Sequence, residues 1–143
     1  MSISLSPYLN FAGNAREAMT FYQSVFGGEL SVSTFGEFGG GGGVVPDDGT
    51  MHAQLVHDGF TLMASDAMPG AEKTWGGTRV YLAFFGDDLA TFTDWFDKLA
   101  EGGNVGQPLE KQVWGDVYGL VMDRFGIEWM FNISQPEGAS QQR

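Results

Sequence analysis

Residues 8–14 read YLNFAGN, and residues 81–87 read YLAFFGD. Tyrosine, leucine, phenylalanine and glycine coincide in order and spacing, so the second stretch repeats the first. Each stretch predicts a short apolar strand that ends in a turn at Gly-Asn14 or Gly-Asp87. Asparagine and aspartate also favour the start of a helix, because their side chains accept hydrogen bonds from free backbone N–H groups. An internal repeat of this kind decides the fold.

A helix is predicted after each repeated stretch. Apolar residues recur at helical spacing over residues 18–26 in the first half and 89–99 in the second. Both stretches stop at a pair of glycines, residues 27–28 and 102–103. Glycine after the last turn permits the left-handed backbone with which many helices end. The two halves therefore agree in the order of their elements as well as in their first strands.

Three further strands complete each half. The sequences HDGF at residues 57–60 and DRFG at 123–126 mark the turn between the last two strands. The predicted strands cover residues 29–37, 50–57 and 60–66 in the first half and 104–113, 116–123 and 127–134 in the second.

The first half carries an additional glycine-rich segment, residues 36–49, which includes five consecutive glycines at 39–43. Two interpretations stay open for this flexible loop: a mobile lid over a binding site, or an insertion without a fixed structure. A phosphate-binding loop is not expected, because such a loop opens a helix and no helical pattern follows here.

These patterns predict an α+β fold, a single domain over residues 1–143 built from two βαβββ modules. The modules cover about residues 3–66 and 78–134, and residues 135–143 form a polar tail. We expect mixed sheets that curve into a cup, with the helices on the outer face. A single ferredoxin-like domain is the main alternative, but it does not predict three consecutive strands after each helix.

Composition limits the possible functions. The chain contains no cysteine, which excludes disulfides, thiolate metal sites and cysteine nucleophiles. No apolar run approaches the roughly 18 residues of a membrane span, and the N-terminus lacks the basic region of a signal peptide, so we expect a cytoplasmic protein. The net charge of −11 argues against nucleic acid and membrane partners. The same charge attracts cationic ligands, or it serves solubility alone.

Further motifs extend beyond the repeat. They read PYLNFAGNA at residues 7–15, FGG at 26–28, SDAMP at 65–69, WGDVYG at 114–119 and DRFG at 123–126. Together they resemble the PhnB-like branch of the glyoxalase/bleomycin resistance protein/dioxygenase (vicinal oxygen chelate) superfamily. The resemblance implies the two-module fold, a homodimer, and a small molecule bound in the cup. Some members are labelled methyltransferases, but this chain shows no glycine-rich strand–turn–helix typical of enzymes that use S-adenosylmethionine.

Metal-dependent relatives in the superfamily place one ligand, typically His, Glu or Gln, on the first and last strand of each module. Carried over by position, these slots fall on Pro7, on Leu62 or Met63, on Arg79 or Val80, and on Met130 or Glu128. A divalent ion needs three or four converging nitrogen or oxygen ligands, so we expect no metal there. A relocated divalent metal is the alternative, but His52 and His57 lie five residues apart on one predicted strand and point to opposite faces.

The strand before the HDGF turn alternates in polarity. His52 and Gln54 share one face, while Met51, Ala53 and Leu55 share the other. The apolar set is expected to pack against the helix, which turns His52 and Gln54 toward the cup. A histidine in that position acts as a general base, contacts a ligand, or serves as a structural hydrogen-bond partner.

A second candidate group lies near the C-terminus. Trp114, Asp116 and Tyr118 alternate on one predicted strand and so share a face. This row suits an amphipathic or cationic ligand through cation–π contact and charge, or it covers a dimer interface. On the last strand, Glu128 shares its face with Asn132 and is expected at the rim of the cup, or in an exposed salt bridge.

Two classes of function compete. The first is a metal-free protein that sequesters or carries a small molecule, as bleomycin-resistance relatives do, with no cofactor. The second is an enzyme: a metal-dependent lyase, isomerase or dioxygenase, or a metal-free catalyst that uses His52. A module that only mediates dimerisation is a third reading. The predicted ligand-binding residues are His52, Gln54, Trp114, Asp116, Tyr118 and Glu128, with His52 as the candidate catalytic residue.

Overall fold

The computed structural model describes residues 4–40, 42–75 and 80–135. The chain divides into two compact units, Met1–Gly77 and Thr78–Arg143, which we call the first and second modules and describe separately. Each module contains one βαβββ succession of elements in the predicted order, which confirms the α+β fold class and the repeat. Within the described residues, no helix is long and apolar enough to cross a lipid bilayer.

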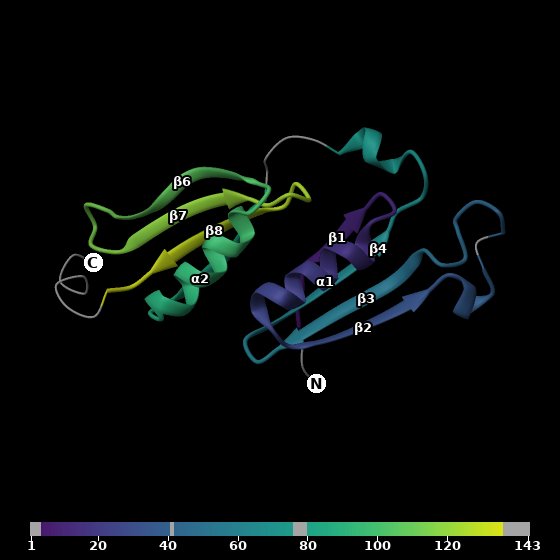
Figure 1. Ribbon diagram of the computed structural model, residues 1–143, viewed down its shortest axis with the longest axis horizontal. Helices are drawn as coiled ribbons and strands as arrows, with labels where there is room; N and C mark the ends of the chain where they lie inside the picture. The colour runs from purple at the N-terminus through teal and green to yellow at the C-terminus, as the bar shows by residue number, and fades with distance from the viewer. Residues whose placement is uncertain (1–3, 41, 76–79, 136–143) are drawn as a thin grey trace. The chain divides into compact units, whose positions relative to one another are not determined.

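The first module consists of one four-stranded sheet and one long helix. Its elements are β1 (Tyr8–Phe11), α1 (Ala15–Phe26), β2 (Glu29–Thr34), the short 3-10 helix η1 (Gly36–Phe38), β3 (Thr50–His57), β4 (Phe60–Asp66) and the 3-10 helix η2 (Ala71–Thr74), labelled in part in Figure 1. The strand order is β1-β4-β3-β2. The chain starts at one edge, crosses as α1 to the opposite edge, and returns through two antiparallel pairings until β4 lies parallel to β1.

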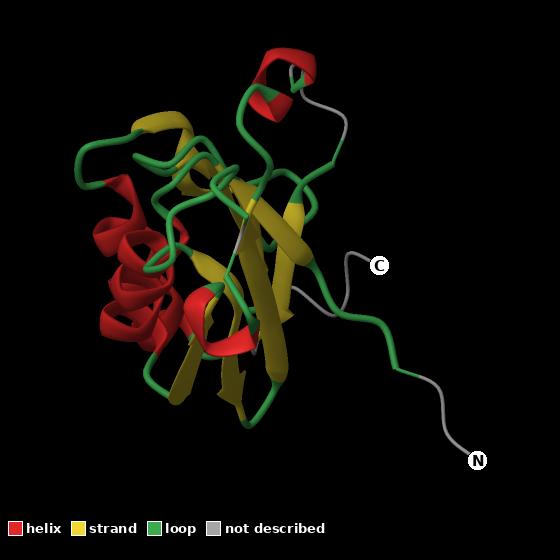
Figure 2. Cartoon of the chain, turned by 90° about the vertical axis from the view of Figure 1, so that its right-hand side faces the viewer, coloured by secondary structure: helices red, strands yellow, loops and turns green. Residues whose placement is uncertain are grey.

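The second module repeats this topology. Its elements are β5 (Leu82–Gly86), α2 (Leu89–Ala100), β6 (Asn104–Lys111), β7 (Val117–Met122) and β8 (Glu128–Ile133). The strand order is β5-β8-β7-β6, and β5 and β8 form the parallel pair. In each module the long helix covers one face of its own sheet (Figure 2). We call the opposite face of each sheet its open face.

The core of the first module lies between α1 and the sheet face that this helix covers. The helix contributes large side chains such as Met19 and Tyr22, which are fully buried. The sheet contributes Leu55 and Leu62 together with two small residues, Ala53 and Ala64. Large helix side chains therefore compensate for small sheet side chains, which keeps the interior at the usual packing density.

Aromatic rings fill the corresponding core of the second module. Phe84 on β5 stands in the middle of the cluster, with the ring centroids of Trp95, Trp129 and Phe131 between 5.2 and 5.7 Å from its own. Phe96 meets Phe131 edge-on at 5.7 Å. Aromatic pairs of this kind add about 0.5–1.5 kcal/mol to the stability that burial alone provides.

The start of α1 is held by a distant residue. Asn14 precedes the helix, yet its side chain forms no cap with any residue that the structure describes. Instead, Oδ1 of Asp66, at the end of β4, accepts a hydrogen bond of 2.8 Å from the backbone N–H of Ala15. The other oxygen, Oδ2, accepts one of 2.9 Å from the backbone N–H of Thr50 at the start of β3. One carboxylate thus ties three segments together.

The start of α2 is capped locally. The capping residue is Asp88 rather than the predicted Asp87: Oδ1 of Asp88 accepts a 3.1 Å hydrogen bond from the backbone N–H of Thr91. Its Oδ2 accepts a second, of 2.7 Å, from the Thr91 hydroxyl. The partner lies three positions after the cap, as expected of an aspartate N-cap.

Strand β2 ends earlier than predicted. It stops at Thr34 instead of residue 37, because the backbone N–H of Thr34 donates to Oε1 of Glu37 at 2.6 Å. The chain then turns into η1. The glycine-rich segment beyond it is closed at its base by backbone hydrogen bonds from Phe35 to Gly49 at 3.0 Å and from Gly36 to Asp47 at 2.8 Å. Whether the segment moves as a lid stays a prediction.

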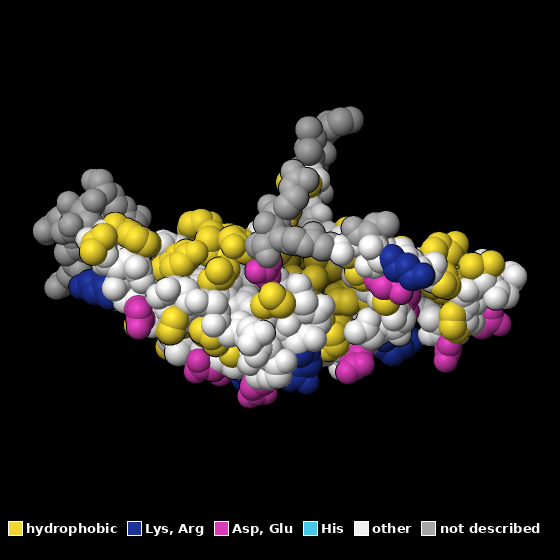
Figure 3. All heavy atoms as spheres, turned by 90° about the horizontal axis from the view of Figure 1, so that it is seen from above, with side chains coloured by type: hydrophobic (Ala, Val, Ile, Leu, Met, Phe, Trp, Pro, Cys, Tyr) yellow, Lys and Arg dark blue, Asp and Glu magenta, His cyan; other side chains and the backbone are white. Residues whose placement is uncertain are grey.

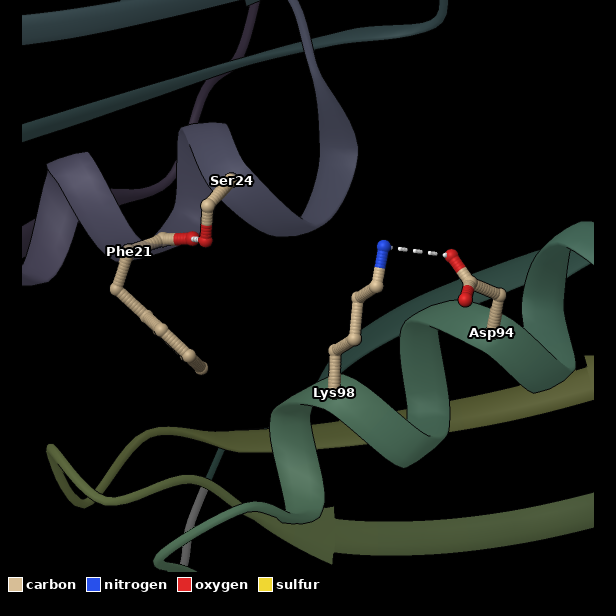
Figure 4. Close-up of polar contacts among 4 residues, drawn as sticks. All are labelled: Phe21, Ser24, Asp94 and Lys98. Atoms are coloured by element: carbon tan, nitrogen blue, oxygen red, sulfur yellow. Dashed lines mark hydrogen bonds and ion pairs between the residues drawn. The ribbon is translucent and has the colours of Figure 1, made fainter.

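Polar contacts on the helix surfaces are short-range. In α1, the Ser24 hydroxyl donates to the Phe21 carbonyl at 2.6 Å, and in α2, Lys98 and Asp94 form an ion pair at 3.0 Å (Figure 4). Elsewhere the surface mixes acidic, basic and apolar side chains, and Figure 3 shows one face of it. Such exposed pairs contribute little to folding, typically about 0.3–0.5 kcal/mol within a helix.

Candidate functional site

The open face of the first module carries mostly polar side chains. His52 and Gln54 on β3 lie on this face, because Ala53 and Leu55 are fully buried on the helix side. This placement agrees with the predicted alternation. Met51 departs from it: the pairing of β2 with β3 shifts register at this point, and Thr50 is buried instead. A β-bulge explains the difference, since one extra residue reverses the alternation before it.

Tyr8 joins His52 on this face. The Tyr8 hydroxyl and Nδ1 of His52 lie 3.0 Å apart in a hydrogen bond, and the two ring centroids are 5.7 Å apart. Tyr8 is 47% exposed and His52 is half-buried. The bond engages Nδ1, so Nε2 is the ring nitrogen that a ligand would contact. Holding one nitrogen fixes the orientation of the ring and couples the role of the other nitrogen to the tautomer.

The sequence did not single out Tyr8, although two signals were present. Tyr8 has the same strand parity as Asn10, which alternates with the apolar Leu9 and Phe11. The parallel pairing of β1 and β4 sets Tyr8 opposite Met63, and Gln54 lies on the other side of Met63. The register of that pairing is what brings the phenol within reach of His52, and the register cannot be deduced from alternation alone.

His57 lies apart from this group. The pairing of β3 with β4 continues without a shift from Ala53 to His57, so the predicted opposition of His52 and His57 is confirmed. His57 stacks on Phe60, its partner in the hairpin, with ring centroids 4.7 Å apart and planes at 13°. It therefore serves the turn and does not join His52 in a common site.

The open face of the second module is more apolar. On β8, Trp129, Phe131 and Ile133 are buried against the helix side, and Glu128 and Asn132 lie on the open face, as predicted. The neighbouring open-face residues are Ala83 and Phe85 on β5, Met130 on β8, and Tyr118, Leu120 and Met122 on β7.

The predicted row of Trp114, Asp116 and Tyr118 does not lie on one strand. Strand β6 ends at Lys111 and β7 begins at Val117, so Trp114 and Asp116 belong to the turn between them. Gly115 bends this turn at a φ of +102°, which disfavours any residue with a Cβ. The prediction of a single strand here was wrong because it overlooked this turn.

The turn nevertheless brings members of the row together. Trp114 is 42% exposed and its ring lies edge-on to Tyr118, with centroids 6.1 Å apart. Asp116 is only 3% exposed, and its Oδ2 accepts a 2.9 Å hydrogen bond from the Asn132 amide on the open face. Asp116 therefore anchors the turn to β8 and does not present an open negative charge to solvent.

Glu128 does not join this group. It pairs with Met122 at one end of the hairpin, whereas Asn132 pairs with Tyr118 near the other. Four residues of extended strand separate Glu128 from Asn132, a distance of roughly 13 Å. The second module thus carries two separate polar positions, one at each end of its open face.

In the first module, the residues at the superfamily's metal slots do not fit a divalent ion. Met63 rather than Leu62 lies on the open face of β4, because Leu62 is buried on the helix side. Pro7 and Met63 offer no side-chain nitrogen or oxygen, and Arg79 lies outside the described residues. Within residues 4–40, 42–75 and 80–135, no three His, Asp or Glu side chains form a cluster that would hold a metal ion.

Relatives of known sequence cover nearly the whole chain. Protein YjdN of Escherichia coli K12 is 34% identical over 140 residues, which cover 90% of this chain and 94% of YjdN. The uncharacterised protein Rv0887c of Mycobacterium tuberculosis is 35% identical over 141 residues, covering 93% of this chain and 74% of that protein.

Solved structures show the same fold. Protein PA1353 of Pseudomonas aeruginosa superposes with a TM-score of 0.82 at 38% identity, over 94% of this chain and 99% of that one. The PhnB protein of Bacillus cereus superposes with a TM-score of 0.75 at 24% identity, over 92% of this chain and 99% of that one. These likenesses agree with the PhnB-like motifs in the sequence.

A family model extends the match to most of the described residues. The model of the Glyoxalase/Bleomycin resistance protein/Dioxygenase superfamily matches residues 4–131. That span includes both long helices and, apart from the end of β8, every strand in the described part of the chain. The chain therefore belongs to the glyoxalase/bleomycin resistance protein/dioxygenase superfamily, and its motifs resemble those of the PhnB-like branch.

Proposed function

We propose that this protein binds a small molecule on the open face of its first module, without the divalent metal of its metal-dependent relatives. The observation that carries the proposal is the hydrogen bond between Tyr8 and His52. It fixes a polar, orientable group on a face whose other side chains include Gln54 and Ser33. A few converging polar groups of this kind are what orient a ligand in most small-molecule sites.

The net charge of the chain and the residues at the superfamily's metal slots support the same proposal. Proline and methionine at first-module slots remove donors that a divalent ion would need. A histidine held by a phenol is a good hydrogen-bond partner for a neutral or cationic ligand, because Nε2 accepts or donates according to the tautomer. The acidic surface, with a net charge of −11, favours the approach of cations over anions.

The two histidines provide a built-in test. The Cε1–H proton signals of His52 and His57 are assigned by comparing His52→Gln and His57→Gln variants. Pools of soluble metabolites are then added to the untagged protein, with His57 as the internal reference. We expect one or more pools to shift the His52 signal while that of His57 stays in place. If every pool leaves both signals unchanged, or shifts both equally, the open face is not the binding site.

Tyr8 provides a finer test with the compound so found. Tyr8→Phe keeps the ring and removes the hydroxyl that holds His52. The loss of one hydrogen bond predicts binding weaker by about threefold to tenfold. Tyr81→Phe in the second module is the matched control and is expected to leave the affinity unchanged. An unchanged affinity in Tyr8→Phe would mean that the phenol does not organise the site.

Metal binding is tested with the same signals. Mn²⁺ broadens the proton signals of any histidine that coordinates it. We expect weak and equal broadening of both histidines, and no stoichiometric metal in elemental analysis of protein purified without chelator. Selective loss of the His52 signal would point to a relocated metal site, and an enzymatic role for His52 would then replace the binding proposal.

Catalysis by His52 is the second candidate, favoured by the same hydrogen bond, since a fixed imidazole is suited to proton transfer. The test separates binding from turnover. If His52→Ala retains affinity for the compound but abolishes its conversion, the chain is an enzyme. If the compound is bound and released unchanged, the carrier or sequestering role stands.

A homodimer in the cytoplasm completes the proposal, as the PhnB-like resemblance implies. Light scattering after size-exclusion chromatography is expected to give twice the chain mass of 15.5 kDa. A mass equal to one chain would contradict the dimer without affecting the binding proposal, because the residues that carry it lie in one module.

A further inference from the structure

A cavity of about 580 Å³ lies in the first module, at the end of the sheet where β1 and β4 finish and β3 begins. Four segments surround it: the turn between β1 and α1, the first turn of α1, the end of the glycine-rich segment, and the chain between β4 and η2. His52, Gln54 and Tyr8 do not line it. The cavity is therefore separate from the open-face site, and its volume falls within the usual range for small-molecule pockets.

The walls of the cavity are tied together by hydrogen bonds. Asp66 lines it and joins the start of α1, through Ala15, to the start of β3, through Thr50. The chain after β4 is held to the end of β1 by a 2.7 Å bond from the Ala67 N–H to the Phe11 carbonyl. Because these bonds connect segments that are far apart in sequence, the space between them exists before any ligand arrives.

The glycine-rich segment supplies the remaining wall. Phe35 and Gly49, which close the base of the segment through a 3.0 Å hydrogen bond, both line the cavity. Gly49 also donates to the Pro46 carbonyl at 3.0 Å, which folds the chain just before β3. The insertion that distinguishes the first half of the sequence from the second thus contributes directly to this cavity.

The lining combines an apolar body with an excess of negative charge. Apolar surface comes from Phe35, Val45, Pro46 and Met68. Among the described residues that line the cavity, four carry carboxylates (Glu17, Asp48, Asp66 and Glu72) and one, Arg16, carries a positive charge. Asp66 is committed to two backbone N–H groups, whereas Glu17, Asp48 and Glu72 are exposed at the rim.

We propose that this cavity is a second binding site, for a small organic cation with an apolar body, such as a substituted ammonium compound. The apolar walls would bury the body of the ligand, and the rim carboxylates would face its charge. An anion of the same size meets a surplus of like charge at the rim and throughout the chain, so it is disfavoured. The site goes beyond the open-face proposal and does not depend on it.

Benzyltrimethylammonium is the probe, and benzoate is the anionic probe of similar size. Binding is followed through backbone amide signals of the ¹⁵N-labelled protein. We expect the cation to shift the amides of Gly13, Gly49 and Ala67, which line the cavity, and to leave the His52 ring signal in place. Benzoate is expected to produce no such shifts.

Charge and volume are then changed separately. In the variant Glu17→Gln/Glu72→Gln, loss of two rim carboxylates is expected to weaken cation binding by about fivefold. The control Glu29→Gln/Glu101→Gln removes the same charge from exposed positions outside the cavity and is expected to bind within twofold of the original protein. Ala12→Trp, at the exposed rim, should block binding, while Ala90→Trp on α2 should not.

The outcomes decide between the sites. Shifts at the cavity that respond to both the charge and the volume variants support the proposal. Equal affinity in the rim and control variants, equal binding of benzoate, or shifts confined to His52 would each overturn it. An overturned cavity site leaves the open-face proposal intact, because the two are read from different signals.

Discussion

The two modules share strand order, a parallel closing pair and one helix-covered face, yet they fill the same positions with different side chains. On the last strand, five residues after the turn glycine, the first module has Ala64 and the second has Phe131, and both are fully buried. A small residue of the first module thus corresponds to a large ring in the second, where other aromatic rings contact it. The volume of the core side chains is therefore balanced within each module. The repeat preserves the order of strands and helices but not the individual core residues.

The open faces differ in a second way. Across the middle of the first sheet, the paired residues are Tyr8, Met63, Gln54 and Ser31; across the second, they are Ala83, Met130, Leu120 and Gln107. The first row offers hydroxyls and an amide where the second offers mainly hydrocarbon. The open faces of the two modules have therefore diverged in polarity, the first toward polar side chains and the second toward apolar ones.

Exchanging core residues between the modules should have the largest effect on stability. Phe131→Ala removes a fully buried ring that contacts three other aromatic residues, and we expect a loss of about 3–5 kcal/mol in the free energy of unfolding. The reverse change, Ala64→Phe, overfills the first module and is expected to cost about 1–3 kcal/mol. Urea unfolding followed by circular dichroism measures both. If either variant retains full stability, the cores are not separately balanced.

The second largest loss of stability is expected at Asp66, whose carboxylate ties three segments together. Asp66→Ala strands the N–H groups of Ala15 and Thr50, and Thr50 is buried. We expect a loss of about 2–4 kcal/mol in unfolding free energy. Glu29→Ala, at an exposed strand position, is the control and should change stability by less than about 0.5 kcal/mol. A similar loss in both variants would show that the three-way tie contributes nothing special.

Acid should weaken the cap at the start of α2. Hydrogen bonds from Thr91, first from its hydroxyl and then from its backbone N–H, hold the pKa of Asp88 below its ordinary value of 3.8. A lowered pKa means that the ionised carboxylate stabilises the folded state above pH 3.8 and that this contribution disappears as the pH falls through the lowered value. Stability measured against pH below 4 should therefore fall less steeply in Asp88→Asn than in the original protein. Equal slopes would contradict this cap.

The smallest effect is expected for the ion pair on α2. Lys98 and Asp94 are both about half exposed, so Lys98→Ala should lower the unfolding free energy by about 0.5 kcal/mol or less. The measurement is again urea unfolding, repeated in high salt, where the original protein and the variant should converge. A loss above about 1 kcal/mol would mean that the pair contributes more to stability than an ordinary exposed ion pair does.

Much of the fold followed from the repeat. The two helices and the last hairpin of each module were predicted because hydrophobic periodicity and turn-forming glycines are local signals in the sequence. The end of β2 was misplaced, and Trp114 and Asp116 were wrongly placed on one strand with Tyr118, since the side-chain bond at Glu37 and the turn at Gly115 override strand propensity. Such local competition depends on geometry that alternation does not encode.

The candidate site was predicted only in part. The facing of His52, Gln54 and Glu128 follows from strand parity, which the sequence shows. The partnership of Tyr8 with His52, and the burial of Asp116 beside Asn132, depend on which strands pair and in which register. Strand register is set by the whole module, so contacts between residues on different strands cannot be predicted from the alternation of polarity along one strand.

The parallel pairing of β1 with β4 also has a consequence for folding. The first strand of the chain finds its partner only in the last strand of the same module, as Tyr8 opposite Met63 shows. The entropy cost of closing so long a loop comes before most of the stabilising contacts form, and this slows folding. On the ribosome, β1 would wait for its partner until β4 has emerged, and the first module would then close while the second is still being made.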